Sequence, residues 1–206
     1  RASLAIAPSN PKVVYAVVAD ARSDRADRLR GIFRSANGGN TWQDISGTHW
    51  AREGQMSYGN AIAVDPKNAN RIVCGGVDLH AWDGKSWTAV SKWDAERGTA
   101  RYAHADHHAV VMPAAAPGRI YDANDGGLDV SEDGAGSWAN RSAGLAVTMF
   151  YDIDVAQTDE RLYGGGAQDN GTLITKTGGA NTFFELLGGD GGWMVVDPKD
   201  ASHIYA

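Results

Sequence analysis

A phrase of two apolar runs separated by a short turn recurs along this chain and constrains its fold more than any other feature. Clear copies span residues 4–16, 61–73 and 193–206, and weaker copies span residues 109–121 and 151–163. Successive copies begin about 40 to 57 residues apart, which is the spacing of a repeat protein. Runs rich in Val, Ile and Tyr, broken by Gly and Asx turns with no helical period between them, predict about four strands in each repeat.

Four-stranded units of about 40 to 50 residues that are arranged radially form the blades of a β-propeller. We therefore expect an all-β fold, with one partial propeller domain over residues 1–206. The expected blades cover approximately residues 3–47, 59–92, 106–144 and 149–188, and a further blade begins at 192–206. The last pair of runs has no outer strands in this chain and would leave exposed sheet edges. We expect about four blades of a larger ring of roughly seven to ten blades, completed by further sequence or by another chain.

A second phrase falls late in the repeat and ends in Trp. It reads Ser-Ala-Asn-Gly-Gly-Asn-Thr-Trp at residues 35–42 and Ser-Glu-Asp-Gly-Ala-Gly-Ser-Trp at residues 131–138, with a shorter copy at 83–87. These segments resemble the Asp-box of sialidase-type repeats. Asx and Gly residues provide a left-handed turn, and the Trp packs against a neighbouring sheet. We expect a structural role for the motif, with buried side chains at Trp42, Trp87 and Trp138.

The composition excludes several classes of protein. An apolar content of 43% with seven Trp and seven Tyr residues is typical of a globular chain. The net charge is −6 and the 19 Lys and Arg residues form no dense run, so a nucleic acid is not an expected partner. No apolar stretch reaches the ~18 residues that span a bilayer, so we expect no membrane span. The single cysteine, Cys74, lies in an apolar run and is expected to be a buried thiol.

The densest polar cluster reads His-Ala-Asp-His-His at residues 104–108. Period-two alternation predicts that His104, Asp106 and His108 share one face and that His107 takes the other. Three roles are open for this cluster. Asp106 can order the loop by accepting hydrogen bonds, the side chains can bind a ligand or catalyse a reaction, or His104, Asp106 and His108 can hold a metal ion. We expect ligand binding and assign no metal and no cofactor.

Carboxylates occur in loops that the repeat places at one end of the propeller. Asn-Asp-Gly-Gly at 124–127 and Gln-Asp-Asn-Gly at 168–171 occupy equivalent loops, and Asp190 lies in a Gly-rich loop. Each segment on its own is also common turn chemistry. Carboxylates that converge would repel one another, and such crowding is typical of a functional site. The catalytic candidates are Asp125, Asp169 and Asp190, and the binding candidates are His104, Asp106, His107, His108, Asn124, Gln168, Asn170 and Trp193.

Aromatic residues in the loops before the first strands are also candidates. The rings expected to be exposed are Trp50, Tyr58, Trp93, Tyr102 and Trp193. Such rings can stack on sugar rings, or they can pack the long loops against the propeller, and the sequence leaves both roles open.

Three segments together resemble a known family: residues 104–109, 124–127 and 165–171. They look like bacterial glycosyl-hydrolase-like BNR-repeat proteins, which are related to the sortilin ten-bladed propeller and to oligoxyloglucan-type xyloglucanases. The resemblance covers essentially the whole chain and implies a secreted or periplasmic propeller, often a glycosyl hydrolase, with a polar central face. The motif copy at 83–87 is degraded, the copy at 175–182 is weaker still, and no sialidase-type arginine triad is identifiable, so sialidase activity is not expected.

Two functions of different classes are open. The first is a glycoside hydrolase-like propeller that acts on or binds carbohydrate at its central face. That chemistry uses two carboxyl groups about 5 to 9.5 Å apart, one as acid and the other as base or nucleophile. The second is a non-catalytic, sortilin-like module that binds a protein or peptide or assists assembly.

Overall fold

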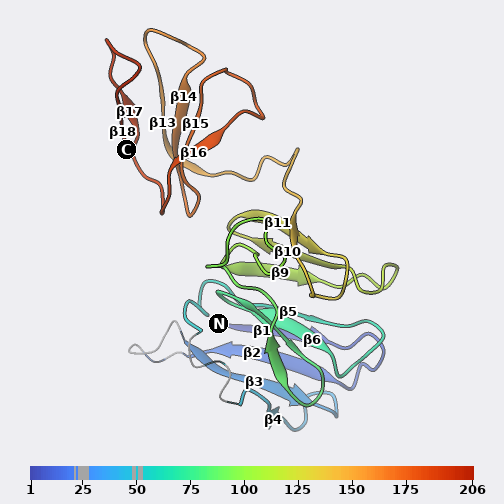
Figure 1. The fold of residues 1–206 in the computed structure, drawn as a ribbon. Coiled ribbons are helices and arrows are strands. Elements are labelled where there is room, and N and C mark those ends of the chain that lie inside the picture. Colours follow the sequence, from blue (N-terminus) through green and yellow to red (C-terminus); the bar gives the residue numbers. More distant parts are fainter. Residues whose placement is uncertain (21, 23–27, 48–49, 51–52) are drawn as a thin grey trace. The chain divides into compact units, whose positions relative to one another are not determined.

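The computed structural model describes residues 1–20, 22, 28–47, 50 and 53–206. Within these residues the chain forms eighteen strands and no helix (Figure 1). The predicted all-β class is confirmed. It follows that the described residues contain no helix of the length and apolarity needed to cross a bilayer.

Strands pair consecutively into four-stranded antiparallel sheets, one in each expected blade. Blade 1 consists of β1 (Ala2–Ile6), β2 (Val14–Ala19), β3 (Leu29–Ser35) and β4 (Gln43–Asp44). Blade 2 consists of β5 (Ala61–Val64), β6 (Ile72–Gly75), β7 (Leu79–Trp82) and β8 (Trp87–Ala89). Blade 3 consists of β9 (His107–Val111), β10 (Ile120–Asn124), β11 (Gly127–Ser131) and β12 (Ala139–Asn140). Blade 4 consists of β13 (Phe150–Val155), β14 (Tyr163–Ala167), β15 (Gly171–Thr175) and β16 (Phe184–Leu187), and it is followed by the pair β17 (Val195–Val196) and β18 (Ile204–Tyr205).

The chain divides into two compact units, Arg1–Gly144 and Leu145–Ala206, and each is described by itself. The single domain predicted over residues 1–206 therefore stays a prediction. Unit 1 contains blades 1 to 3, and their first strands are neighbours, β1 next to β5 and β5 next to β9 (Figure 1). Four-stranded sheets that meet at their innermost strands form a partial β-propeller. Unit 2 contains blade 4 and the β17–β18 pair.

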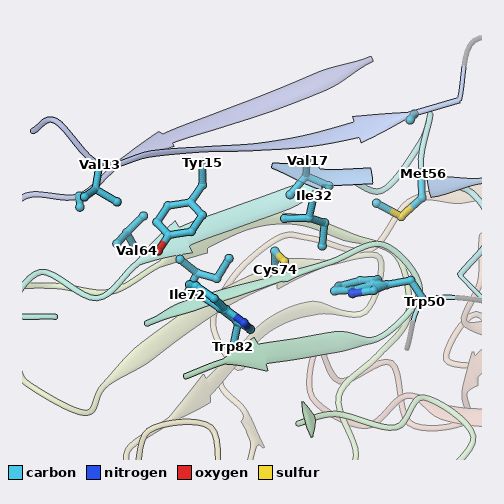
Figure 2. Close-up of a cluster of buried hydrophobic side chains, with 12 residues drawn as sticks. Val13, Tyr15, Val17, Ile32, Trp50, Met56, Val64, Ile72, Cys74 and Trp82 are labelled. Atoms are coloured by element: carbon cyan, nitrogen blue, oxygen red, sulfur yellow. The ribbon is translucent and has the colours of Figure 1, made fainter. Parts of the chain in front are cut away.

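The core of unit 1 lies between successive sheets. Alternate residues of β2, Tyr15 and Val17 among them, pack with Ile72, Cys74 and Trp82 of blade 2 (Figure 2). All five side chains are buried, and the thiol of Cys74 is free and buried as predicted. Burying one large apolar side chain contributes roughly 1.5–3 kcal/mol to stability. This interface therefore stabilises the packing of blade 1 against blade 2.

Unit 2 has a core of its own. Leu162 and Ile174 of blade 4 pack with Met194 and Val196. The Asp154 carboxylate also accepts the backbone N–H of Val196 at 2.7 Å, which ties the first strand of blade 4 to β17.

The Trp-terminated motif forms a turn before the last strand of blades 1 and 3. In blade 3, the Ser131 hydroxyl donates to the Asp133 carboxylate at 2.8 Å, and this carboxylate accepts the backbone N–H of Ser137 at 2.9 Å. Hydrogen bonds from Ser137 and Ser131 lower the pKa of Asp133 to about 2. In blade 1, Oδ1 of Asn37 accepts the backbone N–H of Thr41 at 2.9 Å. The motif therefore acts as a structural turn in both blades.

The motif tryptophans link successive blades. Trp87 of blade 2 donates its indole N–H to the carbonyl oxygen of Ile45 at 2.6 Å. Trp138 of blade 3 is buried and donates in the same way to Val90 at 2.9 Å. The predicted burial is confirmed for Trp138, whereas Trp87 is only partly buried and the prediction is wrong for Trp42, which is 43% exposed. In the described part of unit 1, blade 1 has a neighbouring sheet on its blade 2 side only, so Trp42 has no equivalent carbonyl to bond there.

Candidate functional site

The first strand of blade 3 contains a β-bulge at His108. Asn124 pairs with His107 and Ala123 pairs with Ala109, so His108 is the extra residue. His107 is fully buried, whereas His108 is exposed at the surface. Asp106 precedes the strand with a left-handed backbone, φ 61°. His107 and His108 therefore take opposite faces as alternation predicts, whereas Asp106 is placed by the loop before the strand and not by the pleat of a strand.

Asp125, in the turn between β10 and β11, gathers side chains from two blades. Its Oδ1 lies 2.5 Å from Nε2 of His108, and its Oδ2 accepts the hydroxyl of Tyr58 at 3.0 Å. Tyr58 lies in the loop before β5, and its ring meets the His108 ring edge-on with centroids 4.9 Å apart. Edge-to-face packing is favourable for aromatic rings. These contacts fix the positions of both rings at the surface of unit 1.

Asp106 lies close to Asp125 and has little access to water. It is 8% exposed, and its Oδ1 is buried without a hydrogen-bond partner among the described residues. Burial raises the pKa of Asp106, and the charge of Asp125 raises it further. Three imidazoles oppose this shift, those of His107, His108 and His104. The net shift of the pKa is upward, so Asp106 stays a neutral acid to higher pH than an ordinary aspartate.

His104 is held against the same turn. Its backbone N–H donates to Oδ2 of Asp129 at 3.3 Å. A Cβ added to Gly126 would come within 2.5 Å of the His104 side chain, so only glycine leaves room for this ring. The backbone N–H of Asp125 also donates to the carbonyl oxygen of Ala105 at 3.4 Å. The two loops are thus held together, and we call Tyr58, His104, Asp106, His108 and Asp125 the polar-face cluster.

A buried network of His107, Asp122, Asn124 and Asp129 adjoins this cluster. Nδ1 of His107 lies 2.8 Å from Oδ2 of Asp122. The amide of Asn124 donates to Asp122 and to Asp129, in both cases at 2.8 Å. Burial lowers the pKa of His107, but the charge and hydrogen bond of Asp122 outweigh it, so this pKa is raised. His107 and Asn124 are buried, and Nε2 of His107 has no hydrogen-bond partner among the described residues, so their predicted ligand contacts stay predictions.

A second buried pair lies in blade 2. Oε1 of Glu53 lies 2.8 Å from Nε2 of His80, and the His80 ring contacts Trp50 with centroids 4.2 Å apart. Trp50 is 5% exposed, so its predicted exposure is wrong. The ring is covered because it packs against His80 and Trp87. Glu53 and His80 are not among the candidates predicted from the sequence, and the one signal for them is a histidine inside the apolar run at 79–82.

The remaining candidates lie in unit 2. The backbone N–H of Asp169 donates to the carbonyl oxygen of Asp190 at 3.1 Å. The amide of Asn170 donates to the carbonyl oxygen of Gln168 at 2.8 Å. Trp193 is 79% exposed, as predicted. Because Asp125 belongs to unit 1, the convergence of Asp125, Asp169 and Asp190 on one site stays a prediction.

The described residues provide no ligand set for a metal ion at the polar-face cluster. Within the described ranges, no group of three His, Cys, Asp or Glu side chains is placed to hold a metal ion. The metal site considered at His104, Asp106 and His108 therefore has no support here. A cavity of about 150 Å³ lies between the β5–β6 and β9–β10 turns, lined in part by Arg71 and Pro113. None of its lining residues belongs to the polar-face cluster.

Comparison with known proteins gives partial similarity to several solved structures. No family model matches the sequence, and no curated protein is similar to it. A GH74 enzyme from Niastella koreensis is 18% identical, with a TM-score of 0.45 over 98% of this chain and 33% of its own. The GH74 xyloglucanase from Xanthomonas campestris is 16% identical, with a TM-score of 0.49 over 98% of this chain and 43% of its own. YCF48 from Cyanidioschyzon merolae is 11% identical, with a TM-score of 0.42 over 93% of this chain and 57% of its own. The chain spans less than half the length of the two GH74 proteins, and likeness at this level concerns the fold alone.

Proposed function

We propose that this chain is part of a glycoside hydrolase-like propeller that binds and cleaves carbohydrate at the polar-face cluster. One observation carries the proposal: unit 1 brings two carboxyl groups, Asp106 and Asp125, together in different surroundings. Asp106 is nearly buried and its pKa is raised, whereas Asp125 contacts the side chains of His108 and Tyr58. Hydrolysis of a glycosidic bond needs a group that donates a proton and a second group that acts on the attacking side. Asp106 suits the role of proton donor, and Asp125 together with the His108 that it contacts suits the attacking side.

Exposed aromatic rings in the loops of the same blades suit a sugar ligand. Tyr58 and Trp93 are exposed before β5 and β9, and Tyr102 is partly buried. The Asp78 carboxylate accepts the backbone N–H of Trp93 at 2.8 Å, which anchors that loop. Aromatic faces offer a rigid apolar surface for the apolar face of a sugar ring. Unit 2 contains the remaining candidates of this proposal. The catalytic candidates there are Asp169 and Asp190, and the binding candidates are Gln168, Asn170 and Trp193.

The proposal includes a secreted or periplasmic location and further blades from additional sequence or another chain. Its support is the family resemblance of residues 104–109, 124–127 and 165–171. A polysaccharide outside the cell is too large to cross a membrane unaided. An enzyme that cleaves it therefore has to be secreted or periplasmic itself.

The second candidate function is a non-catalytic module that binds a protein or peptide at the same face. The buried network favours it, because the amide of Asn124 and Nδ1 of His107 bond within the protein. Fewer polar groups are then left for a reacting substrate. Such a module would bind its partner through exposed aromatic rings and would catalyse no reaction.

The experiment measures reducing ends released from soluble polysaccharides, xyloglucan included, and binding to the same polymers by affinity gel electrophoresis. We expect D106N to lower turnover about 100-fold or more, because a positioned general acid contributes 10²–10⁴-fold. Asp94 pairs with Lys92 at the surface at 3.1 Å, and the matched control D94N is expected to keep full activity. Binding without turnover would support the non-catalytic candidate. Neither binding nor turnover on any polysaccharide would refute the proposal.

A further inference from the structure

Both oxygens of the Asp125 carboxylate are engaged within the protein. Oδ1 lies 2.5 Å from Nε2 of His108, and Oδ2 accepts the Tyr58 hydroxyl at 3.0 Å. The side chain of Asp125 is 11% exposed, whereas that of His108 is 36% exposed. A carboxylate in this position orients the imidazole, and the imidazole is the group that a ligand can reach.

The contact with Asp125 also selects which nitrogen of His108 carries hydrogen. A carboxylate oxygen accepts, so Nε2 donates, and the neutral ring then has its lone pair on Nδ1. Nδ1 has no hydrogen-bond partner among the described residues. The Tyr58 ring packs against the imidazole at an interplanar angle of 90°, which restricts rotation of the ring. An oriented imidazole with an unprotonated nitrogen is a proton acceptor.

We propose that His108 is the catalytic base of this face and that Asp125 and Tyr58 are its positioning residues. For the identity of the substrate, this inference rests on the proposed function. In the hydrolytic step, Nδ1 of His108 takes one proton from water while the water oxygen forms a bond to the anomeric carbon. The bond from that carbon to the leaving oxygen breaks, and the electron pair stays on the leaving oxygen. The Asp106 carboxyl gives its proton to this oxygen, and proton exchange with solvent restores both groups.

Other His–carboxylate pairs in the described chain lack this combination of exposure and orientation. His107 and Asp122 are fully buried, so no ligand reaches the ring. His203 and Asp200 pair at 3.0 Å and are both exposed, so water competes for the contact. The His108 pair joins an exposed imidazole to a mostly buried carboxylate. This arrangement lets the ring accept a proton at the surface and keeps the ring oriented.

Titratable groups from three elements lie near His108. Asp125, from the β10–β11 turn, and Tyr58, from the loop before β5, are in direct contact. Asp106, from the loop before β9, acts through its charge. Because Asp125 accepts the hydrogen bond from Nε2, its removal is expected to let both neutral tautomers of His108 be populated.

The first test needs no substrate. ¹⁵N NMR of the histidine rings, in the full chain at a pH where the rings are neutral, reports which nitrogen carries hydrogen. We expect the Nε2–H tautomer at His108 in the wild type and a mixture of tautomers in D125A. H203Q assigns the exposed control histidine and is expected to leave the His108 signals unchanged. An Nδ1–H tautomer in the wild type, or no change in D125A, would overturn the inference.

The second test uses any polysaccharide that the wild-type chain cleaves. H108Q is expected to lower kcat about 100-fold or more with little change in KM, because a general base acts in the transition state. H203Q is expected to have wild-type kinetics. Full activity in H108Q would overturn this inference and leave the proposed function standing. Absence of cleavage by the wild type would refute the proposed function, and the tautomer result would then decide the role of His108.

Discussion

Trp138 donates its indole N–H to the carbonyl oxygen of Val90 at 2.9 Å, which joins the motif turn of blade 3 to the end of blade 2. The same bond recurs one blade earlier, from Trp87 to Ile45. A polar contact repeated between blades restricts how neighbouring sheets pack. The bond therefore helps to keep blades 2 and 3, which contribute the polar-face cluster, in a fixed arrangement.

Replacing Trp138 with Phe is expected to lower the free energy of unfolding by about 1–3 kcal/mol, because it leaves the Val90 carbonyl without its donor. Urea unfolding followed by circular dichroism measures the change. W42F is the matched control, since Trp42 is 43% exposed, and its expected effect is below about 0.5 kcal/mol. Equal losses in the two variants would show that the inter-blade bond contributes nothing.

The fold is expected to lose stability as the pH rises above about 6.5. The pKa of His107 is raised in the folded state by Asp122, against the effect of burial. Its stabilising contribution is fully present below the unfolded pKa of about 6.5 and is lost as the pH rises through the higher folded value. Chemical unfolding between about pH 5.5 and pH 8.5 measures this dependence. It should weaken in H107Q and persist in H203Q, and an unchanged dependence in H107Q would rule out the charged buried pair.

Apolar alternation and Gly or Asx turns predicted the strands because both signals are local in the sequence. The exposures of Trp42 and Trp50 were predicted wrongly, since each depends on which sheet or loop lies opposite. The Glu53–His80 contact joins residues 27 positions apart, one in a loop and one in a strand. No local pattern relates those two residues.

In the candidate site, too, some features could be predicted from local sequence signals and others could not. All members of the polar-face cluster could be nominated from the sequence, because the repeat assigns their loops to one end of the blades. The bulge at His108 could not be predicted, since alternation assumes uninterrupted pairing of the two strands. Alternation already puts His107 and His108 on opposite faces, and the bulge shifts the pattern after them, so that Ala109 is exposed and Val110 is buried. The phase of the strand after His108 therefore required the structure.

The G126A substitution is expected to displace the His104 ring and to destabilise the chain by about 1–3 kcal/mol, as overpacking usually does. The added Cβ would lie 2.5 Å from the His104 side chain. Thermal unfolding and the NMR signals of the His104 ring measure both effects. G192A is the control, because its added Cβ meets nothing within 4 Å. Unchanged His104 signals in G126A would show that the ring does not pack on this glycine.

Stability is also expected to fall in acid as the Asp133 carboxylate, in the motif turn of blade 3, is protonated. Hydrogen bonds from Ser137 and Ser131 lower the pKa of Asp133 from 3.8 to about 2. Its contribution is present above the ordinary value and is lost as the pH falls through the folded value. Unfolding measured between about pH 4.5 and pH 2 should show a weaker pH dependence in D133N than in D94N. The same acid dependence in both variants would argue against this role for Asp133.

The central claim is that carbohydrate binds at the polar-face cluster of unit 1. An NMR titration of the ¹⁵N-labelled histidine rings with soluble oligosaccharides, xyloglucan fragments among them, tests it most directly. We predict saturable shifts at His104 and His108 and none at His203. A titration in which no histidine shifts, or in which His203 alone shifts, would contradict the account.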